Sequence, residues 1–196
     1  MAKAFSRKGA RVVGRLDEAE REVVVGLLEQ TRVFLAPAEV ADTGDPFEDL
    51  VGSFGVADAD QAPRDPALDR LLPAGHRGDA EVAAEFRRFT EQGLREKKSA
   101  NIDLAVSSLR EVASDRVSLD RDQAAALLVA LTDVRLLLGE RLGLRTDEDA
   151  DALAELLHTS LSDEGDPDPR QHLLRLAAYY DFLTWLQESL AHALSR

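Results

Sequence analysis

The chain has 196 residues, of which 44% are hydrophobic and only 5% are aromatic, and it contains no cysteine. These numbers fit one domain with an aliphatic core, and they exclude disulfides and thiolate chemistry. The formal net charge of −13 argues against free-standing nucleic-acid binding, because Lys and Arg on phosphates supply most of that affinity.

The N-terminal region predicts a β-hairpin followed by a capped helix. Within residues 1–16, two short apolar stretches flank Arg7-Lys8-Gly9, as in a small hairpin. Asp17 and Glu20 have the spacing of a capping box, which predicts a helix of about 18 residues that ends before Pro37. Its expected buried stripe is Val23, Val24, Leu27, Thr31 and Phe34.

Residues 37–78 are rich in Asp, Gly and Pro and predict an irregular segment. Asp45-Pro46 and Asp65-Pro66 each place an N-cap residue before a proline, which predicts short helices within it. Acidic residues are concentrated here and near the C-terminus. Residues 37–69 hold nine acids against Arg64 alone, and residues 147–168 hold nine acids and no base.

Four further helical patterns follow, over residues 79–112, 120–143, 146–161 and from Asp168-Pro169 almost to the C-terminus. The first allows a break near Gly93 or Ser99. We therefore expect well over half of the residues to be helical. The predicted fold is mainly α: a single domain over residues 1–196, built as a bundle of about five main helices with the hairpin at the front.

Polar residues interrupt the apolar stripes of these helices. Stepping about 100° per residue places Arg135 on the stripe of its helix, beside Leu131 and Leu138. A buried guanidinium without a partner is costly, so Arg135 requires a carboxylate or several carbonyl groups. Asp181 and Glu188 border the apolar face of the last helix, and we predict that one of them pairs with Arg135.

Two other helices carry similar interruptions. Thr184 and Gln187 fall on the apolar face of the last helix, and Lys97 and Asn101 lie on the stripe of the long helix. That stripe is Val82, Phe86, Phe89 and Leu104. The candidate buried polar network or interaction site is Lys97, Asn101, Arg135, Asp181, Thr184, Gln187 and Glu188. It allows three interpretations: an internal network that fixes helix register, the lining of a groove for a partner or ligand, or a catalytic site.

Motifs for common chemistries are missing from the sequence. The four histidines have no metal-ligand spacing, and no nucleotide-binding or hydrolase motif occurs. We predict no catalytic, cofactor-binding or metal-binding residues and no cofactor. Without an apolar run of membrane-spanning length or a signal region, we expect a cytoplasmic protein.

Three segments carry a resemblance to a known family. Residues 131–142, LTDVRLLLGERL, resemble its Leu-Asn-Asp-x-Arg-Leu-x-Leu-Gly-x-Arg-Leu segment, with Thr132 in place of Asn. Residues 180–190, YDFLTWLQESL, are similar to its C-terminal motif, and Leu94-Arg95 with Lys98 and Asn101 matches a looser segment. The family is the actinobacterial oxidative-stress regulator (AosR) family, formerly a domain-of-unknown-function family encoded near the ClpS adaptor.

The resemblance implies a non-enzymatic, transcription-associated regulator that acts through a protein partner such as a sigma factor. The redox sensing of that family needs a cysteine pair, which this chain lacks, so thiol sensing cannot be carried over. On this reading the acidic segments, or a groove near Arg135, bind a basic surface of the partner. The oligomeric state is not predicted.

Two other functions compete with this reading. The helical bundle could bind a small molecule, or act as an enzyme, through a polar pocket around Arg135. A closed, paired network favours the regulator, and an open pocket with an unpaired Arg135 favours the ligand-binding protein. Direct DNA binding by the basic residues of 3–15 and 87–98 is disfavoured by the net charge, and would require these bases on one face with the acids turned away.

Overall fold

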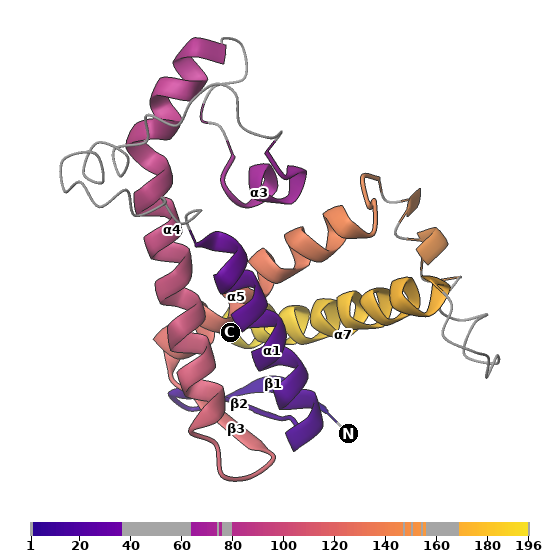
Figure 1. Cartoon of the computed structure of the whole chain (residues 1–196). Coiled ribbons are helices and arrows are strands. Elements are labelled where there is room, and N and C mark those ends of the chain that lie inside the picture. The colour runs from indigo at the N-terminus through magenta and orange to yellow at the C-terminus, as the bar shows by residue number, and fades with distance from the viewer. Residues whose placement is uncertain are drawn as a thin grey trace, which may run out of the picture.

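The computed structural model describes residues 2–36, 64–73, 75, 80–146, 148, 149, 151–153, 155 and 169–195. Of these residues, 74% are helical, which confirms a mainly α fold. Figure 1 shows the long helices around a common centre, with a small sheet at one end. The elements are β1 (Lys3–Lys8), β2 (Arg11–Arg15), α1 (Glu18–Leu35), α3 (Pro66–Leu71), α4 (Ala80–Arg110), β3 (Arg116–Leu119), α5 (Arg121–Arg141) and α7 (Pro169–Ser195).

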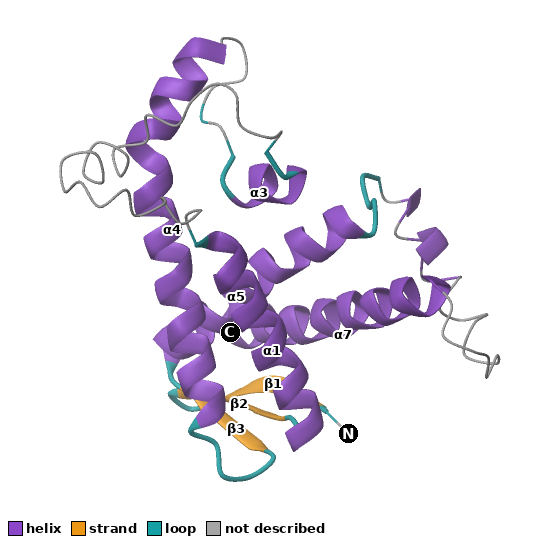
Figure 2. Cartoon of the chain, in the orientation of Figure 1, coloured by secondary structure: helices purple, strands orange, loops and turns teal. Residues whose placement is uncertain are grey.

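The sheet contains the predicted hairpin and one further strand. Strands β1 and β2 pair antiparallel around Gly9, whose φ of 65° is one that glycine adopts without strain. Strand β3 joins the other edge of β2, so the order is β1-β2-β3 (Figure 2). Four residues, RVSL, were too short a stretch to predict β3 from the sequence. The sheet packs on α7 and α5.

Helix α1 begins and ends as its sequence predicts. Asp17 accepts a hydrogen bond from the backbone N–H of Glu20, and Glu20 accepts one from the backbone N–H of Asp17, which confirms the capping box. The predicted stripe was correct for Val24 and Thr31 but otherwise displaced by one position. The buried residues are Val24, Val25, Leu28, Thr31 and Leu35.

Helix α4 is continuous over 31 residues, without a break at Gly93 or Ser99. Its predicted stripe was wrong, because all four of its residues are exposed, Phe89 by 75%. The side that faces the bundle carries smaller residues. Drift of the helical phase over so long a helix, together with the choice of the largest side chains as markers, led to the error. The buried hydrophobic residues of α4 are Ala83, Ile102, Ala105, Val106 and Leu109.

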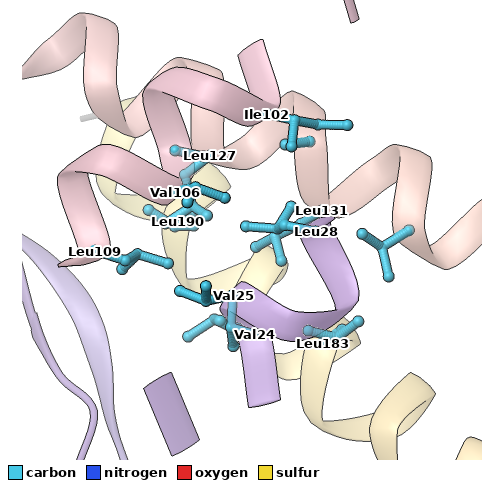
Figure 3. Packing of buried hydrophobic residues seen from close by; sticks show 14 of the residues in the cluster. Val24, Val25, Leu28, Ile102, Val106, Leu109, Leu127, Leu131, Leu183 and Leu190 are labelled. Atoms are coloured by element: carbon cyan, nitrogen blue, oxygen red, sulfur yellow. The ribbon is translucent and has the colours of Figure 1, made fainter. Parts of the chain in front are cut away.

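Helix α5 lies at the centre of the fold. It contacts α1, α3, α4 and α7 as well as the sheet, and it is therefore buried on several sides. Asp120 and Gln123 form a capping box at its start, and Gly143, with a φ of 72°, follows its end, as predicted. Figure 3 shows Leu127 and Leu131 of α5 within the core that α1, α4 and α7 complete.

Other predictions fall partly or wholly outside the described residues. Asp65-Pro66 begins α3 as predicted, with the Asp65 carboxylate accepting from the backbone N–H of Ala67. Asp45-Pro46 and most of the predicted helix 146–161 lie outside the described residues. Helix α7 begins at Pro169, as predicted. Within the described part of the chain, no helix has an apolar stretch long enough to cross a membrane.

Candidate functional site

Arg135 on α5 joins this helix to α7 through two neutral partners. Its Nη1 donates to Oε1 of Gln187 at 2.5 Å, and its Nη2 donates to the Tyr180 hydroxyl at 3.2 Å. The guanidinium carbon also lies 5.0 Å from the centroid of the Tyr180 ring, within the range of a cation–π contact. The Arg135 side chain is half-buried, and the Tyr180 ring and the Gln187 amide hold its guanidinium in place.

The prediction that a carboxylate pairs with Arg135 was wrong. Asp181 and Glu188 are both exposed. On a helix that turns about 100° per residue, both lie roughly 80–100° around α7 from Tyr180, beyond the edge that faces α5. Neutral partners on Nη1 and Nη2 take the place of the expected carboxylate, and the side chain of Arg135 keeps partial contact with solvent. The predicted proximity of Gln187 to Arg135 is confirmed.

Gln187 is the central residue of this network. While its Oε1 accepts from Arg135, its Nε2 donates to the Thr132 hydroxyl at 2.7 Å, and that hydroxyl donates to the Leu128 carbonyl. Thr132, which stands where the family motif has Asn, thus provides a hydroxyl oxygen that accepts a hydrogen bond from Gln187 of α7. Thr184 plays no part across the helices, since its hydroxyl donates to the Tyr180 carbonyl of its own helix.

A buried ion pair joins α4 to α5. Lys98 Nζ lies 2.5 Å from Oδ1 of Asp133, and the side chains are 15% and 2% exposed. The sequence analysis placed the polar residue of this face at Lys97, which is exposed, and Asn101 is half-buried. Lys98 and Asp133 both lie in the segments that carry the family resemblance. Asp133 follows Ala126 by seven residues and Ala130 by three, so the three residues lie on the same side of α5. This spacing from two small apolar residues was the signal in the sequence that could have indicated its burial.

The environment of Asp133 opposes its charge. Burial raises the pKa of the Asp133 carboxyl above its ordinary value of 3.8, and the hydrogen bond and charge of Lys98 only partly offset this. Its Oδ2 is buried and has no hydrogen-bond partner among the described residues. The ion pair therefore fixes two helices at an energetic cost, and the stability of the protein depends on Lys98 remaining in place.

Two basic residues of α4, Arg95 and Lys98, bind partners inside the fold. The Arg95 guanidinium binds Glu91 at 2.6 Å and donates to the carbonyls of Leu35 and Ala36 at the end of α1. Those carbonyls are among the unsatisfied groups at a helix C-terminus, so Arg95 caps α1. With Lys98 bound to Asp133, residues 87–98 do not form a free basic face.

An apolar groove of about 400 Å³ lies between α1, α5 and α7. Apolar side chains dominate its lining, and Gln30, Arg141 and His172 supply much of its polar character. Among the described residues that line it, none is acidic. Arg135 does not belong to this lining. The residues are Leu27, Gln30, Thr31 and Phe34 of α1, Val134, Leu137, Leu138 and Arg141 of α5, and His172, Leu173 and Leu176 of α7.

The chemistry of these features is that of packing and recognition. Two of the three guanidinium nitrogens of Arg135 are paired, and its Nε is buried without a partner in the described part of the chain. The network thus joins α5 to α7, and it contributes no residue to the lining of the groove. Within the described residues, no group of three or more His, Cys, Asp or Glu side chains could hold a metal ion.

A family model described as a domain of unknown function (DUF2017) matches residues 2–194. No curated protein and no solved structure matches the chain. The matched range contains the Arg135 network, the Lys98–Asp133 pair and every residue of the groove.

Proposed function

We propose that this chain, which belongs to the DUF2017 family, is a non-enzymatic regulator of transcription that acts in the cytoplasm by binding a protein partner at the groove between α1, α5 and α7. The AosR resemblance of residues 131–142 and 180–190 suggests an alternative sigma factor as the partner. Regulation by binding needs a surface for recognition and no reacting groups, which matches the features described above.

The observation that carries the proposal is the groove itself. A monomer usually exposes few contiguous apolar surfaces, and those that it exposes are often interaction sites. Leu173, at one side of the groove, remains 46% exposed although it is a large aliphatic residue. Three helices present leucine, valine and phenylalanine side chains into one depression, which is the geometry that accepts the apolar face of a partner helix.

The charge around the groove specifies the partner. Arg141 and His172 lie among its lining residues, and no described lining residue is acidic. Arg141 also donates to the Asp65 carboxylate at 2.5 Å, so an acidic partner residue would share this guanidinium with Asp65. We therefore assign to this groove an amphipathic helix whose apolar face is flanked by Asp or Glu. This differs from the basic partner surface expected from the acidic segments, which lie largely outside the described residues.

The alternative, a ligand-binding protein or enzyme with a polar pocket around Arg135, has less support. Its guanidinium is engaged by Gln187 and Tyr180, and the groove does not include it. A ligand at Arg135 would have to displace both partners.

Binding to purified sigma factors of the host tests the proposal. Each sigma factor is immobilised, and the affinity of the parent is measured by biolayer interferometry. Leu173→Glu should weaken binding at least tenfold, because it places a carboxylate in an apolar interface beside an acid-flanked helix. Trp185→Glu is the matched control, since Trp185 is an exposed apolar residue of the same helix, 38% exposed and outside the groove.

Two outcomes would contradict the proposal. If no sigma factor binds the parent, the assigned class of partner is wrong. If Trp185→Glu weakens binding as much as Leu173→Glu does, the groove is not the contact. Leu173→Glu should melt close to the parent, because Leu173 is already 46% exposed. Trp185→Glu also loses the stacking of Trp185 on Phe182, so its fold is verified by circular dichroism before its binding is compared.

A further inference from the structure

The outer face of the sheet is strongly basic, although the chain as a whole is acidic. Residues that are partners in register share a face of the sheet. Lys3, Arg15 and Arg116 form one row across the three strands, Ser6, Val13 and Ser118 form a second, and Lys8 and Arg11 form a third. The basic sheet face comprises Lys3, Lys8, Arg11, Arg15 and Arg116 with Ser6 and Ser118.

The opposite face of the sheet belongs to the core. Phe5, Val12, Val117 and Leu119 are buried in the main hydrophobic cluster and face α5 and α7. The five cations of the basic sheet face are all exposed, and none of the three strands contains an acidic residue. The register of the sheet thus turns Lys3, Lys8, Arg11 and Arg15 to one side and adds Arg116, which is distant from them in sequence. Arg7, the register partner of Val12, lies on the other side.

The cations on this face remain available to a partner. Arg15 lies 3.8 Å from Asp115, but both side chains are more than half exposed, and such pairs contribute little. Arg11 lies across β3, donating to the hydroxyl and the carbonyl of Ser118. Arg11 also lines a small hollow of about 30 Å³ together with Arg7 and with Arg121 at the start of α5.

We propose that the basic sheet face binds the phosphate backbone of duplex nucleic acid without sequence specificity. Cations and hydroxyls are the groups that contact phosphates, and they position a protein without reading bases. A protein partner would need an apolar anchor in the contact. The single apolar residue of this face, Val13, is only 7% exposed. The strands also present no aromatic ring on this side for base stacking, which argues for a duplex over a single strand.

The net charge of −13 limits the affinity but does not exclude the contact. Exposed charges are screened over about 8 Å at physiological ionic strength, so the charge of the face itself decides local attraction. One part of the requirement for DNA binding, bases gathered on one face, is met by the basic sheet face, and one exposed acid, Asp115, lies beside Arg15 at 3.8 Å. That part is not met by residues 87–98. The contact is independent of the groove and of its proposed partner.

Fluorescence anisotropy with a labelled mixed-sequence DNA duplex of about 24 base pairs tests this inference. Affinity for the parent should fall steeply with salt, with a log–log slope of about −3 to −4.5 for contacts from up to five cations. The triple variant Arg11→Gln, Arg15→Gln, Arg116→Gln should bind at least tenfold more weakly, with a slope shallower by about 2 to 3. The corresponding Lys triple should retain most of the binding, since it keeps the charge.

The matched control is the triple variant Arg32→Gln, Arg88→Gln, Arg110→Gln. It has the same net charge as the first triple but removes exposed cations of α1 and α4, so it should lose less than threefold. An equal loss in both Gln triples would overturn the inference, as would absence of binding by the parent at about 20 mM salt. Polyglutamate and unlabelled duplex are compared, at equal total charge, as competitors of the labelled duplex. If polyglutamate displaces the labelled duplex as well as unlabelled duplex does, the ligand of this face is an acidic protein segment and the inference is wrong. A duplex RNA competitor distinguishes the two nucleic acids.

Discussion

Replacement of Lys98 by Met is expected to lower the free energy of unfolding by about 3–5 kcal/mol at pH 7.5. The substitution keeps the aliphatic stem but leaves the Asp133 carboxylate, 2% exposed, without its partner. In a chain of this size such a loss corresponds to a decrease in melting temperature of roughly 10 °C. Thermal unfolding followed by circular dichroism measures it.

The destabilisation by Lys98→Met should depend on pH. Because burial raises the pKa of Asp133 in the folded state, its contribution to stability is fully present below the unfolded pKa and is lost as the pH rises through the folded pKa. Removal of Lys98 raises this folded pKa further. As the pH falls, the carboxyl of the variant takes up a proton at a higher pH than that of the parent and loses its charge, so the difference in stability from the parent shrinks toward low pH and grows toward high pH.

Two controls isolate the buried pair. Lys97→Met changes the exposed neighbouring lysine and should leave the melting temperature nearly unchanged. The double variant Lys98→Met, Asp133→Leu removes both charges and should recover much of the lost stability, because a buried ion pair often contributes no more than a well-packed apolar pair. A Lys98→Met protein that melts like the parent at every pH would show that the pair is not buried.

Replacement of Gln187 by Met is expected to destabilise the fold by about 2 kcal/mol, or roughly 4–8 °C. The variant keeps the length of the side chain but removes the acceptor of Arg135 and the donor to Thr132. Arg135 then retains only Tyr180 as a partner. The loss is smaller than at Lys98 because Arg135 is half-buried and water can replace part of the interaction.

A double-mutant cycle tests the link between α5 and α7. Arg135→Met and Gln187→Met, alone and together, should show a coupling energy of about 1 kcal/mol, since each removes one side of the same hydrogen bond. Glu188→Gln, at the exposed position next to Gln187, is the control and should have almost no effect. If the effects of the two Met substitutions on the free energy of unfolding are strictly additive, Arg135 and Gln187 do not interact. A large effect of Glu188→Gln would indicate that Glu188 pairs with Arg135 after all.

The elements of this fold were predictable where local signals mark their ends. Capping boxes at Asp17 and Asp120, the Asp65-Pro66 start of α3 and Gly143 after α5 each place a boundary through backbone hydrogen bonds or dihedral angles within a few residues. Strand β3 has no such signal. Its four residues become a strand because β2 offers a free edge to them.

The candidate site was predictable only in part, for a different reason. Arg135 and Gln187 were found because each interrupts a clear apolar stripe. To predict that Lys98 is buried and Lys97 is exposed, one must know which side of α4 faces the bundle. That side is marked by small residues such as Ala83 and Ala105, whereas several of the large hydrophobic residues of α4 are exposed. Asp133 lies on a second buried side of α5, marked only by the small residues Ala126 and Ala130, and the leucine stripe of the helix does not reveal it.

Hydrogen–deuterium exchange on the chain, alone and bound to the sigma factor that the binding measurements identify, tests the proposed function most directly. The account predicts slower exchange in the facing parts of α1, α5 and α7 that line the groove, with exchange in β1 and β2 unchanged. Slower exchange confined to α4 or to the sheet, with the groove segments unchanged, would contradict it.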